Sequence, residues 1–544
     1  MVSQKSFMKT LKQLVMAKSI CGTAKENIAL EKIVKLLYEI PYFQTNPENL
    51  QVVKVPEDRL NRAFVSAFIK SQTTTKETII ITGHFDVVGV DDFGSLKNIA
   101  FDIKKITARI KELNPDQIAL SDLESGEWLF GRGIADMKYG IALCIEILRW
   151  FSKKDPIPGN ILFLGVPGEE ANSEGMLAAI PYLENLQSNG YHFKACFNTE
   201  CTVPKWTKDY TRRIYTGTIG KINPMFFCKG KEAHVCASLS CINPNLIISE
   251  ITRQIEGDLD FCTSFEGQFS PPPVCTKQTD LKYIYNAQTP LYAVSYYNLL
   301  ILDIDEEVLL QKLKEIAKNA FNIALNKAQK NAKDYSTLTG KLELANEYPP
   351  IILTFEELYS QVLTDSPEFE RYIDNKIDLW QKKGLDHQTI SIKMIKELCD
   401  AHKYQDPIII IGFCPPFYPS RIMGKTTNNE INLHKLIDQA IDFAKENFNE
   451  SIEKCSFYDA ICDLSYIGRF STNEHDAISV NMPGLGKNYK LPIRSLSNLN
   501  IPGVVFGGLG KDFHKNTERL HIPYSLGVIP KVYEFILNEI FHSE

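Results

Sequence analysis

The sequence predicts an α/β fold with a smaller α+β domain inserted into it. Short apolar runs of strand length, such as Ile161–Val166, stop at glycine or proline and alternate with longer segments whose apolar residues have helical spacing. From Thr216 the pattern changes to a strand, helix, strand, helix module, which is typical of a small sandwich domain. A chain of 544 residues has room for roughly two to four domains.

Composition and charge exclude several classes of protein. The chain is 44% hydrophobic and 23% charged, as in ordinary globular proteins, and its net charge of -6 implies no general attraction to nucleic acid or to an anionic membrane. No apolar run has the length of a signal peptide or a membrane span. The 13 cysteines lack any Cys-x-x-Cys pair, which favours free thiols in a reducing compartment, hence the cytoplasm, over disulfides or a thiolate zinc site.

The first residues with a chemical signature follow a strand near the N-terminus. The elements predicted before them are two helical segments within 7–40 and strands at 52–55, 63–69 and 78–83. The last of these strands ends at His84, and the two-residue period of a strand puts His84 and Asp86 on one face. The carboxylate then holds one ring nitrogen while the other binds a metal. The alternative is a hydrogen-bonded pair without a metal.

Carboxylates recur at the following element ends. Asp136 stands at the entry of the apolar helix 141–150, Glu169 and Glu170 follow the strand 161–166, and Glu200 follows a strand at 193–197. Taken singly, Asp136 suits a helix N-cap and the glutamate pair suits a solvated loop. Their regular recurrence instead favours one site beyond the carboxyl ends of the strands, where open α/β sheets bind ligands.

The second half of the chain predicts an insertion and a return to the first domain. We expect the domains 1–215, 216–330 (the α+β sandwich), 331–405 (a lysine-rich helical insertion) and 406–544. His234 lies between a strand at 224–228 and a helix at 246–255, and His514 follows a strand at 504–506. Asp463, Ser465 and Tyr489 lie in polar or glycine-rich segments that are predicted to line a pocket. Helices at 433–448 and 528–541 complete the chain.

Together these motifs resemble those of the metallopeptidase family that contains glutamate carboxypeptidase, acetylornithine deacetylase, succinyl-diaminopimelate desuccinylase and the aminoacylases. The motifs are His84-Phe85-Asp86, Gly131-Arg132-Gly133 with Asp136-Met137-Lys138, Gly168-Glu169-Glu170, Glu200, Gly230–His234 and His514. Order and spacing agree over roughly residues 5–330 and 455–544. The length, the Pro415–Pro419 turn, Asp463–Tyr466 and Gly510–His514 look like the RocB arginine-utilisation branch. The resemblance implies a mixed-sheet zinc-peptidase catalytic domain of the phosphorylase/hydrolase-like type, with the inserted sandwich as its lid.

The resemblance also implies a set of roles for the site residues. Two zinc ions are expected, and Co²⁺ or Mn²⁺ would be suitable in their place. One ion is held by His84, Asp136 and Glu170, and the other by Asp136, Glu200 and His514. Asp136 therefore bridges the two ions. Glu169 is the general base, Asp86 orients His84, and the Asp136–Met137 peptide is cis. His234 donates to the scissile carbonyl oxygen when the lid closes; the alternative is an ordinary loop histidine.

The activity implied by the resemblance is hydrolysis of an amide or peptide bond next to a free carboxylate. The substrate is then a small N-acylated amino acid or a short peptide, cleaved by a deacylase or carboxypeptidase type of reaction in arginine or amino-acid catabolism. Glu200 favours this reading over a dipeptidase or aminopeptidase, which remains the alternative. A non-catalytic binding protein on the same fold is a second alternative, although no ligand and no base is missing. We expect no nucleic-acid or membrane partner, and either a monomer or a homodimer formed through the lid.

Overall fold

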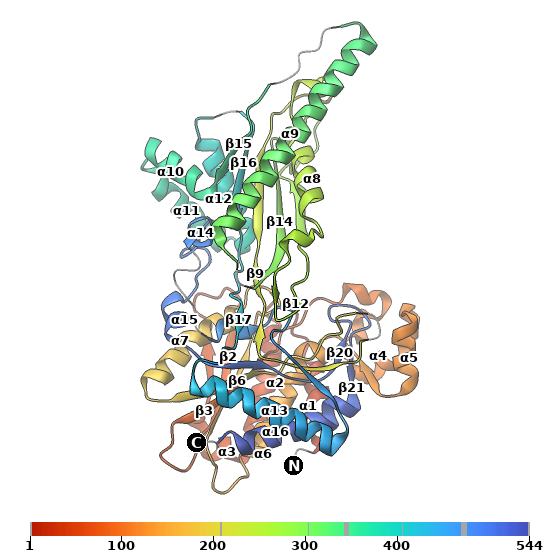
Figure 1. Cartoon of the computed structure of the whole chain (residues 1–544), viewed down its shortest axis with the longest axis vertical. Coiled ribbons are helices and arrows are strands. Elements are labelled where there is room, and N and C mark those ends of the chain that lie inside the picture. Colours follow the sequence, from red (N-terminus) through yellow and green to blue (C-terminus); the bar gives the residue numbers. More distant parts are fainter. Residues whose placement is uncertain are drawn as a thin grey trace. The chain divides into compact units, whose positions relative to one another are not determined.

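A large mixed sheet in the first of two compact units positions most of the predicted site residues. A computed structural model of the chain describes residues 3–206, 209–302, 304–341, 347–404, 406–468 and 476–541. Unit 1 comprises Met1–Ile219, Arg421–Phe470 and Pro492–Glu544, and unit 2 comprises Gly220–Ser420 and Ser471–Leu491. Figure 1 shows the elements of both units along the chain.

The sheet of unit 1 has eight strands in the order β1-β2-β5-β3-β6-β19-β7-β18. These strands are β1 (Leu50–Lys54), β2 (Ala63–Ile69), β3 (Glu77–His84), β5 (Asn160–Val166), β6 (His192–Asn198), β7 (Arg212–Tyr215), β18 (Ile452–Cys455) and β19 (Gly503–Val505). β3 runs parallel to both β5 and β6, and β19 runs parallel to β6, whereas β2 is antiparallel to β5. The predicted mixed sheet is thus confirmed. The carboxyl ends of β5, β3, β6 and β19 meet at one edge.

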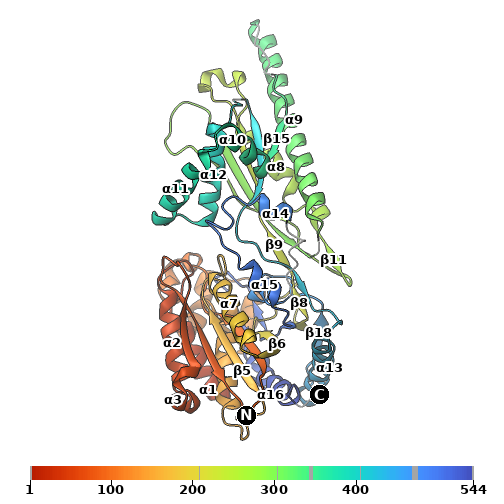
Figure 2. The ribbon, with the colours of Figure 1, turned by 90° about the vertical axis from the view of Figure 1, so that its left-hand side faces the viewer.

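Helices and two small sheets complete unit 1. The helices are α1 (Gln4–Met16), α2 (Glu26–Tyr38), α3 (Pro41–Thr45), α4 (Ile103–Arg109), α5 (Gln117–Ser125), α6 (Tyr139–Phe151), α7 (Glu174–Ser188), α13 (Asn428–Phe448), α15 (Ile493–Asn498) and α16 (Ile529–Glu539). The small sheets pair β20 (Gly510–Lys511), β21 (Arg519–His521) and β4 (Trp128–Phe130) in one case, and β17 (Arg421–Ile422) with β8 (Gly217–Thr218) in the other. Figure 2 shows α7 and α15 side by side in this unit.

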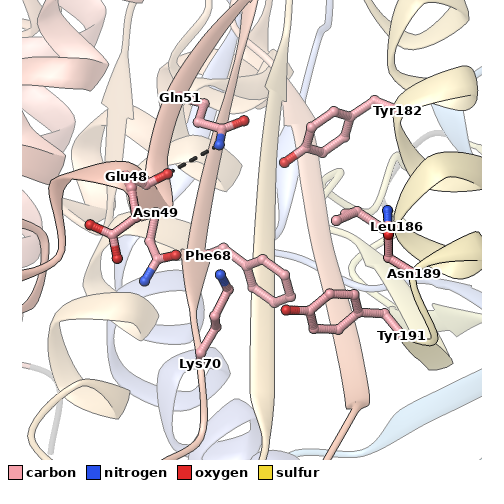
Figure 3. A pocket seen from close by; sticks show the side chains of 9 residues that line it. All are labelled: Glu48, Asn49, Gln51, Phe68, Lys70, Tyr182, Leu186, Asn189 and Tyr191. Atoms are coloured by element: carbon pink, nitrogen blue, oxygen red, sulfur yellow. Dashed lines mark hydrogen bonds between the residues drawn. The ribbon is translucent and has the colours of Figure 1, made fainter.

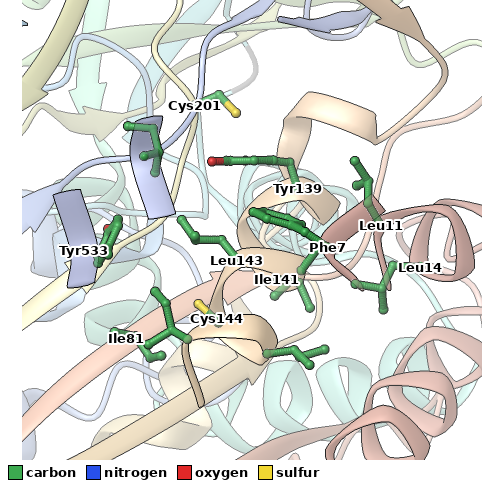
Figure 4. Packing of buried hydrophobic residues seen from close by; sticks show 14 of the residues in the cluster. Phe7, Leu11, Leu14, Ile81, Tyr139, Ile141, Leu143, Cys144, Cys201 and Tyr533 are labelled. Carbon is green, nitrogen blue, oxygen red and sulfur yellow. The ribbon is translucent and has the colours of Figure 1, made fainter. Parts of the chain in front are cut away.

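The packing of α6 fixes the segment that carries Asp136. Most residues of α6 are buried, and it packs between β3 and α1. Figure 4 shows Phe7 of α1 over Tyr139, with the two ring centroids 5.4 Å apart in a stacked arrangement. The Tyr139 hydroxyl donates to the carbonyl oxygen of Ser525 at 2.6 Å. Because most of α6 is buried, it holds the turn before it deep in unit 1.

Unit 2 is a second sheet covered by helices on both faces. Its strands are β9 (Gly220–Ile222), β10 (Pro224–Lys229), β13 (Val274–Asp280), β14 (Tyr292–Ile301), β15 (Ile351–Thr354) and β16 (Ile408–Phe413), with a separate hairpin of β11 (Ser264–Phe265) and β12 (Gln268–Phe269). Its helices are α8 (Pro244–Ile255), α9 (Glu306–Thr339), α10 (Phe355–Asp365), α11 (Phe369–Lys382), α12 (His387–Ala401) and α14 (Asp476–Val480). Figure 1 shows α8 along α9.

Successive side chains of β10 point to opposite faces of the unit 2 sheet, and both faces are covered by helices. Met225 and Phe227 belong to one apolar cluster with residues of α10, α11 and α12, while Phe226 makes an edge contact with Tyr297. The Tyr297 hydroxyl lies 2.7 Å from the hydroxyl of Thr252 on α8, so the opposite face of the sheet meets that helix. A strand buried on both faces is mostly apolar, as β10 is from Pro224 to Cys228.

The limits of unit 2 differ from those expected. The strand β16 falls in the last expected domain, 406–544, but it pairs with β10 and β15 inside the sheet of unit 2. The expected helical insertion 331–405 begins within α9, includes the strand β15 and ends before β16, so it is part of unit 2. Because β16 is apolar throughout, its sequence fits a buried strand of either sheet, and only its pairing decides which.

All 13 cysteines are free thiols, and none is joined in a disulfide. Nine of them are buried, which is common for free cysteine in a core. Among the helices that the structure describes, none combines the length and the apolar character that crossing a membrane requires.

Candidate metal centre

His84, at the carboxyl end of β3, has one ring nitrogen held by its own strand end. Its side chain is 1% exposed, and Nδ1 lies 3.1 Å from the main-chain oxygen of Asp86, with the Asp86 carboxylate at 3.5 Å. Since a carbonyl oxygen only accepts hydrogen bonds, Nδ1 carries the proton. Nε2 is therefore the nitrogen with a lone pair for a cation, and the carbonyl of Asp86 shares the orienting role predicted for its carboxylate.

The carboxylate of Asp86 has a second task. Its Oδ1 accepts the main-chain N–H of Glu169 at 3.2 Å, and its Oδ2 accepts that of Glu170 at 3.1 Å. The preceding Gly168 has φ of 79°, and a Cβ there would lie 2.4 Å from a carboxylate oxygen of Glu174. The turn after β5 thus needs glycine and is tied to the end of β3 by one buried aspartate.

Asp136 lies between the two histidines. Its Oδ1 is 3.2 Å from Nε2 of His84, and its Oδ2 is 3.0 Å from Nε2 of His514. Burial alone would raise the pKa of Asp136, but its contacts with the two histidines outweigh burial and lower that pKa well below its usual range. The Asp136–Met137 peptide is cis, as the family resemblance implied.

The direct contacts place Glu170 and Glu200 with the opposite histidines from those expected. Glu200 lies with His84, its Oε1 at 3.3 Å from Nε2, and Glu170 lies with His514, its Oε2 at 2.9 Å from Nε2. His84, Asp136 and Glu170 also have ligand atoms within 4.8 Å of one another. We base the division on the shorter contacts, because a cation binds donors that are already side by side. Asp136 then belongs to both groups.

The donor set fits divalent cations of the zinc type. Oε2 of Glu200 is buried and has no hydrogen-bond partner among the described residues. A buried acceptor without a donor is costly, and a cation would satisfy it. All the donors are nitrogen or oxygen atoms, which is typical of catalytic rather than structural zinc. His514 is about half exposed, so the cluster is accessible from that side.

Glu169 and Asp463 supply carboxylates beside this cluster. Glu169 is 9% exposed, and its Oε2 lies 3.8 Å from Nε2 of His84. Burial raises the pKa of Glu169 well above its ordinary value; His84 opposes this rise, and the Asp463 and Glu170 carboxylates add to it. Burial likewise raises the pKa of Asp463 to about 7, although His84 and the Ser173 hydroxyl lower it.

Three other predicted residues lie in different surroundings. The Ser465 hydroxyl faces the main-chain oxygen of Ile219 at 3.4 Å, and the Tyr489 hydroxyl lies 3.3 Å from the main-chain nitrogen of Phe417 in unit 2. Both contacts are with main-chain atoms, as in ordinary packing, so we do not include Ser465 or Tyr489 in the proposed site. His234 is an exposed residue of unit 2 whose Nδ1 accepts the N–H of Cys236 at 3.3 Å. In the neutral ring the proton is then on Nε2, as a hydrogen-bond donor requires.

Two buried residues beside the cluster were given no role by the sequence-based reasoning. Arg132 and Glu518 are each 1% exposed and form an ion pair at 3.0 Å. The signal that would have found them is spacing, because Arg132 stands four residues before Asp136 and Glu518 stands four residues after His514.

A separate surface hollow of about 160 Å³ lies against β1, β2 and α7. Figure 3 shows its lining, in which the rings of Phe68 and Tyr191 have centroids 5.0 Å apart. It is lined mainly by aromatic and amide side chains, with Lys70 and Glu48 as its charged residues. None of the histidines or carboxylates of the metal centre lines it, so we do not assign the chemistry to this hollow.

A mixed sheet that gathers two histidines and several buried carboxylates beside a glutamate of raised pKa defines a class, the metal-dependent hydrolases. The chain belongs to Peptidase family M20/M25/M40, whose sequence profile matches residues 112–467. The Uncharacterized protein YqjN of Bacillus subtilis (strain 168) is 32% identical over 536 residues, covering 97% of this chain and 95% of that protein. Protein RocB of the same organism is 31% identical over 520 residues, covering 95% and 92%.

A solved structure supports the fold. The di-peptidase Dug1p from Saccharomyces cerevisiae has a TM-score of 0.58 to this chain at 10% identity, covering 99% of this chain and 96% of that one. The predicted family, the similarity to RocB and the enzyme class are therefore confirmed. At this low identity the Dug1p structure shows the fold alone.

Proposed function

We propose that the protein is a dinuclear zinc amidohydrolase that cleaves an amide or peptide bond next to a free carboxylate. The observation that carries this proposal is the placement of the Asp136 carboxylate, with one oxygen 3.2 Å from His84 and the other 3.0 Å from His514. A carboxylate between two ligand groups is the arrangement that a two-metal site requires.

We infer two groups of ligands from the direct contacts. His84, Asp136 and Glu200 would hold one cation, and Asp136, Glu170 and His514 would hold the other. When bound, two such cations supply Lewis acidity toward the scissile carbonyl and lower the pKa of water. Zinc suits the mixed imidazole and carboxylate donors, and Co²⁺ or Mn²⁺ would also be accepted.

Glu169 is the proposed general base. Its turn is fixed by Asp86, and its side chain lies beside His84, whereas its neighbour Glu170 contacts His514. In this role its carboxylate accepts a proton from the attacking water and later returns it to the leaving nitrogen. Burial favours the protonated form of Glu169, which makes its carboxylate a stronger base for the attacking water.

The substrate is a small N-acylated amino acid or a short peptide, with N-acyl amino acid deacylation or carboxypeptidase cleavage as the reaction. Glu200, rather than an aspartate at that ligand position, supports this choice by family analogy. One observation favours the dipeptidase alternative: Asp463 is a carboxylate that is 1% exposed, and its negative charge would suit the free amino group of a dipeptide.

The free thiols support a cytoplasmic location. Disulfides form and persist mainly in oxidising compartments, and all 13 cysteines are unlinked. The chain is 31% identical to RocB, and the resemblance to the RocB arginine-utilisation branch supports a place in arginine or amino-acid catabolism.

Metal analysis joined to a substrate panel tests the function. We expect close to two zinc ions per chain and faster hydrolysis of N-acetyl or N-succinyl amino acids than of free dipeptides with the same C-terminal residue. Preference for the free dipeptides would favour the dipeptidase. Two bound metals without hydrolysis of any substrate would favour a binding protein. The Glu169→Gln variant is the control for contaminating hydrolases, since it should bind the metals without turnover.

A further inference from the structure

The buried carboxylate of Glu518 is surrounded by hydrogen-bond donors from the segment that leads to Asp136. Its Oε1 accepts the main-chain N–H groups of Ala135 at 3.1 Å and Asp136 at 3.3 Å. Its Oε2 accepts the N–H of Gly133 at 3.0 Å and Nη1 of Arg132 at 3.0 Å. Three of these four donors belong to the main chain. The carboxylate is therefore bound to the backbone of the turn and is not simply one half of an ion pair.

The Arg132 guanidinium extends this contact to the segment that carries His514. Its Nη1 lies 3.3 Å from the carbonyl oxygen of Lys515, and its Nη2 lies 3.5 Å from that of His514 itself. Nη2 also donates to both carboxylate oxygens of Asp92, at 2.9 and 2.8 Å. A single Arg132–Glu518 pair thus contacts the main chain on both sides of the cluster.

Both the Asp136 turn and the His514 loop need to be held in a fixed position. Asp136 has to present its two oxygens to different histidines, and a small rotation of its turn would break one of these contacts. His514 has φ of 63°, a left-handed conformation that residues other than glycine seldom adopt. Such a conformation persists only where the surrounding structure determines it, and Arg132 supplies part of that constraint.

We propose that Glu518 is a positioning residue, which together with Arg132 holds the Asp136 turn against the His514 loop so that both metal-binding groups form together. This inference rests on the proposed function, because it concerns the same two-metal site. The role requires a carboxylate. A glutamine at 518 would turn its NH₂ group toward N–H donors and would leave at least one of them without an acceptor.

The Glu518→Gln variant tests the proposal through metal binding rather than turnover. Removal of partners that orient metal ligands typically weakens metal affinity by roughly 10- to 100-fold. We expect competition with a chromophoric chelator to show such a loss for both zinc ions, and the visible spectrum of the Co²⁺-loaded protein to change. Circular dichroism of the variant should remain that of the wild type.

Glu146→Gln is the matched control. Glu146 is also a buried glutamate of unit 1, 2% exposed, and it accepts from Thr10 at 2.7 Å and lies 3.4 Å from Arg149. Because it contacts neither the Asp136 turn nor the His514 loop, its loss should lower thermal stability and leave zinc affinity and the Co²⁺ spectrum unchanged.

Wild-type zinc affinity in folded Glu518→Gln would overturn the proposal, and so would an equal loss of zinc in Glu146→Gln. If Glu518→Gln does not fold, Arg132→Lys answers the same question: it keeps the positive charge but gives up the planar fork that reaches both loops. Two zinc ions held at wild-type affinity by Arg132→Lys would contradict the inference. Failure of the wild-type protein to bind a metal pair would instead contradict the proposed function.

Discussion

At the scale of single residues, Glu169 and Glu170 show how two adjacent carboxylates acquire different tasks. The carboxylate of Asp86 binds both of their main-chain N–H groups, and the two side chains then diverge. Glu170 contacts His514 at 2.9 Å, while Glu169 lies 3.8 Å from His84. A residue in contact with a proposed ligand histidine suits metal binding, and its neighbour suits proton transfer.

Glu169→Gln should therefore separate proton transfer from metal binding. The amide keeps the shape of the side chain but accepts no proton, and loss of a general base costs roughly 10²- to 10⁴-fold in kcat. We expect zinc content near that of the wild type together with such a loss. Glu170→Gln is the contrasting variant, because it should lose zinc as well. Loss of zinc from Glu169→Gln would make Glu169 a ligand and exclude it as the base.

Asp136→Asn tests the shared carboxylate. The substitution removes one anionic oxygen that faces two ligand groups, so both zinc ions should be released together in a chelator titration. Glu200→Gln should affect mainly the ion held with His84, since Glu200 contacts that histidine. Retention of both ions at wild-type affinity by Asp136→Asn would exclude the bridging role.

The sequence predicted which residues gather but not how they are paired. His84, Glu169, Glu170 and Glu200 follow short apolar strands, and the carboxyl ends of neighbouring parallel strands meet at one edge of a sheet. Their pairing depends on strand order and side-chain direction, which local patterns do not contain. Glu200 accordingly lies with His84, whereas the resemblance had placed it with His514. Asp86 was expected to orient His84, and its bonds to Glu169 and Glu170 were not foreseen.

At the scale of elements, the loop between β20 and β21 contains His514 and has two residues in the left-handed conformation. Asp512 has φ of 56° and His514 has φ of 63°. The Asp512 carboxylate holds this loop closed, because it accepts from the Thr517 hydroxyl at 2.8 Å and from the Arg519 guanidinium. Left-handed conformations of this kind cost roughly 1 to 3 kcal/mol each, so the loop depends on these bonds.

Asp512→Ala should loosen His514 without reaching His84. We expect the ion held by His514 and Glu170 to be lost first, so that zinc content falls from two ions toward one at limiting chelator. Glu112→Ala is the control, because its partner Arg109 is an exposed residue of α4 and such pairs contribute little. Equal loss of both ions from Asp512→Ala would show that the loop supports the whole centre rather than one half of it.

The elements of unit 2 show where reasoning from sequence reached its limit. The helical spacing before residue 331 continues through the expected boundary, because α9 is one helix from Glu306 to Thr339. A strand of four residues, β15, was hidden within the predicted helical insertion. Its neighbour β16 is apolar on both faces, and nothing in its own sequence indicates which sheet it joins.

At the scale of the whole molecule, the chain forms two units, and the proposed metal ligands all belong to unit 1. The predicted carbonyl-binding histidine, His234, belongs to unit 2 and follows β10 in the chain. Its role stays a prediction. Two features suit it: the ring is exposed, and the bond from the Cys236 N–H to Nδ1 leaves the proton of the neutral ring on Nε2.

His234→Ala tests whether unit 2 takes part in catalysis. If Nε2 donates to the carbonyl oxygen only as negative charge develops there, its removal should cost roughly 10²- to 10³-fold in kcat with little change in KM. Zinc content should remain that of the wild type, because His234 is not a ligand. The melting temperature should change little, because the side chain is exposed and its one main-chain bond is local. Val235→Ala alters the next residue, which is 55% exposed, and should leave kcat within a few-fold of the wild type. If His234→Ala behaved like that control, His234 would be an ordinary loop histidine, and catalysis would have to be explained by unit 1 alone.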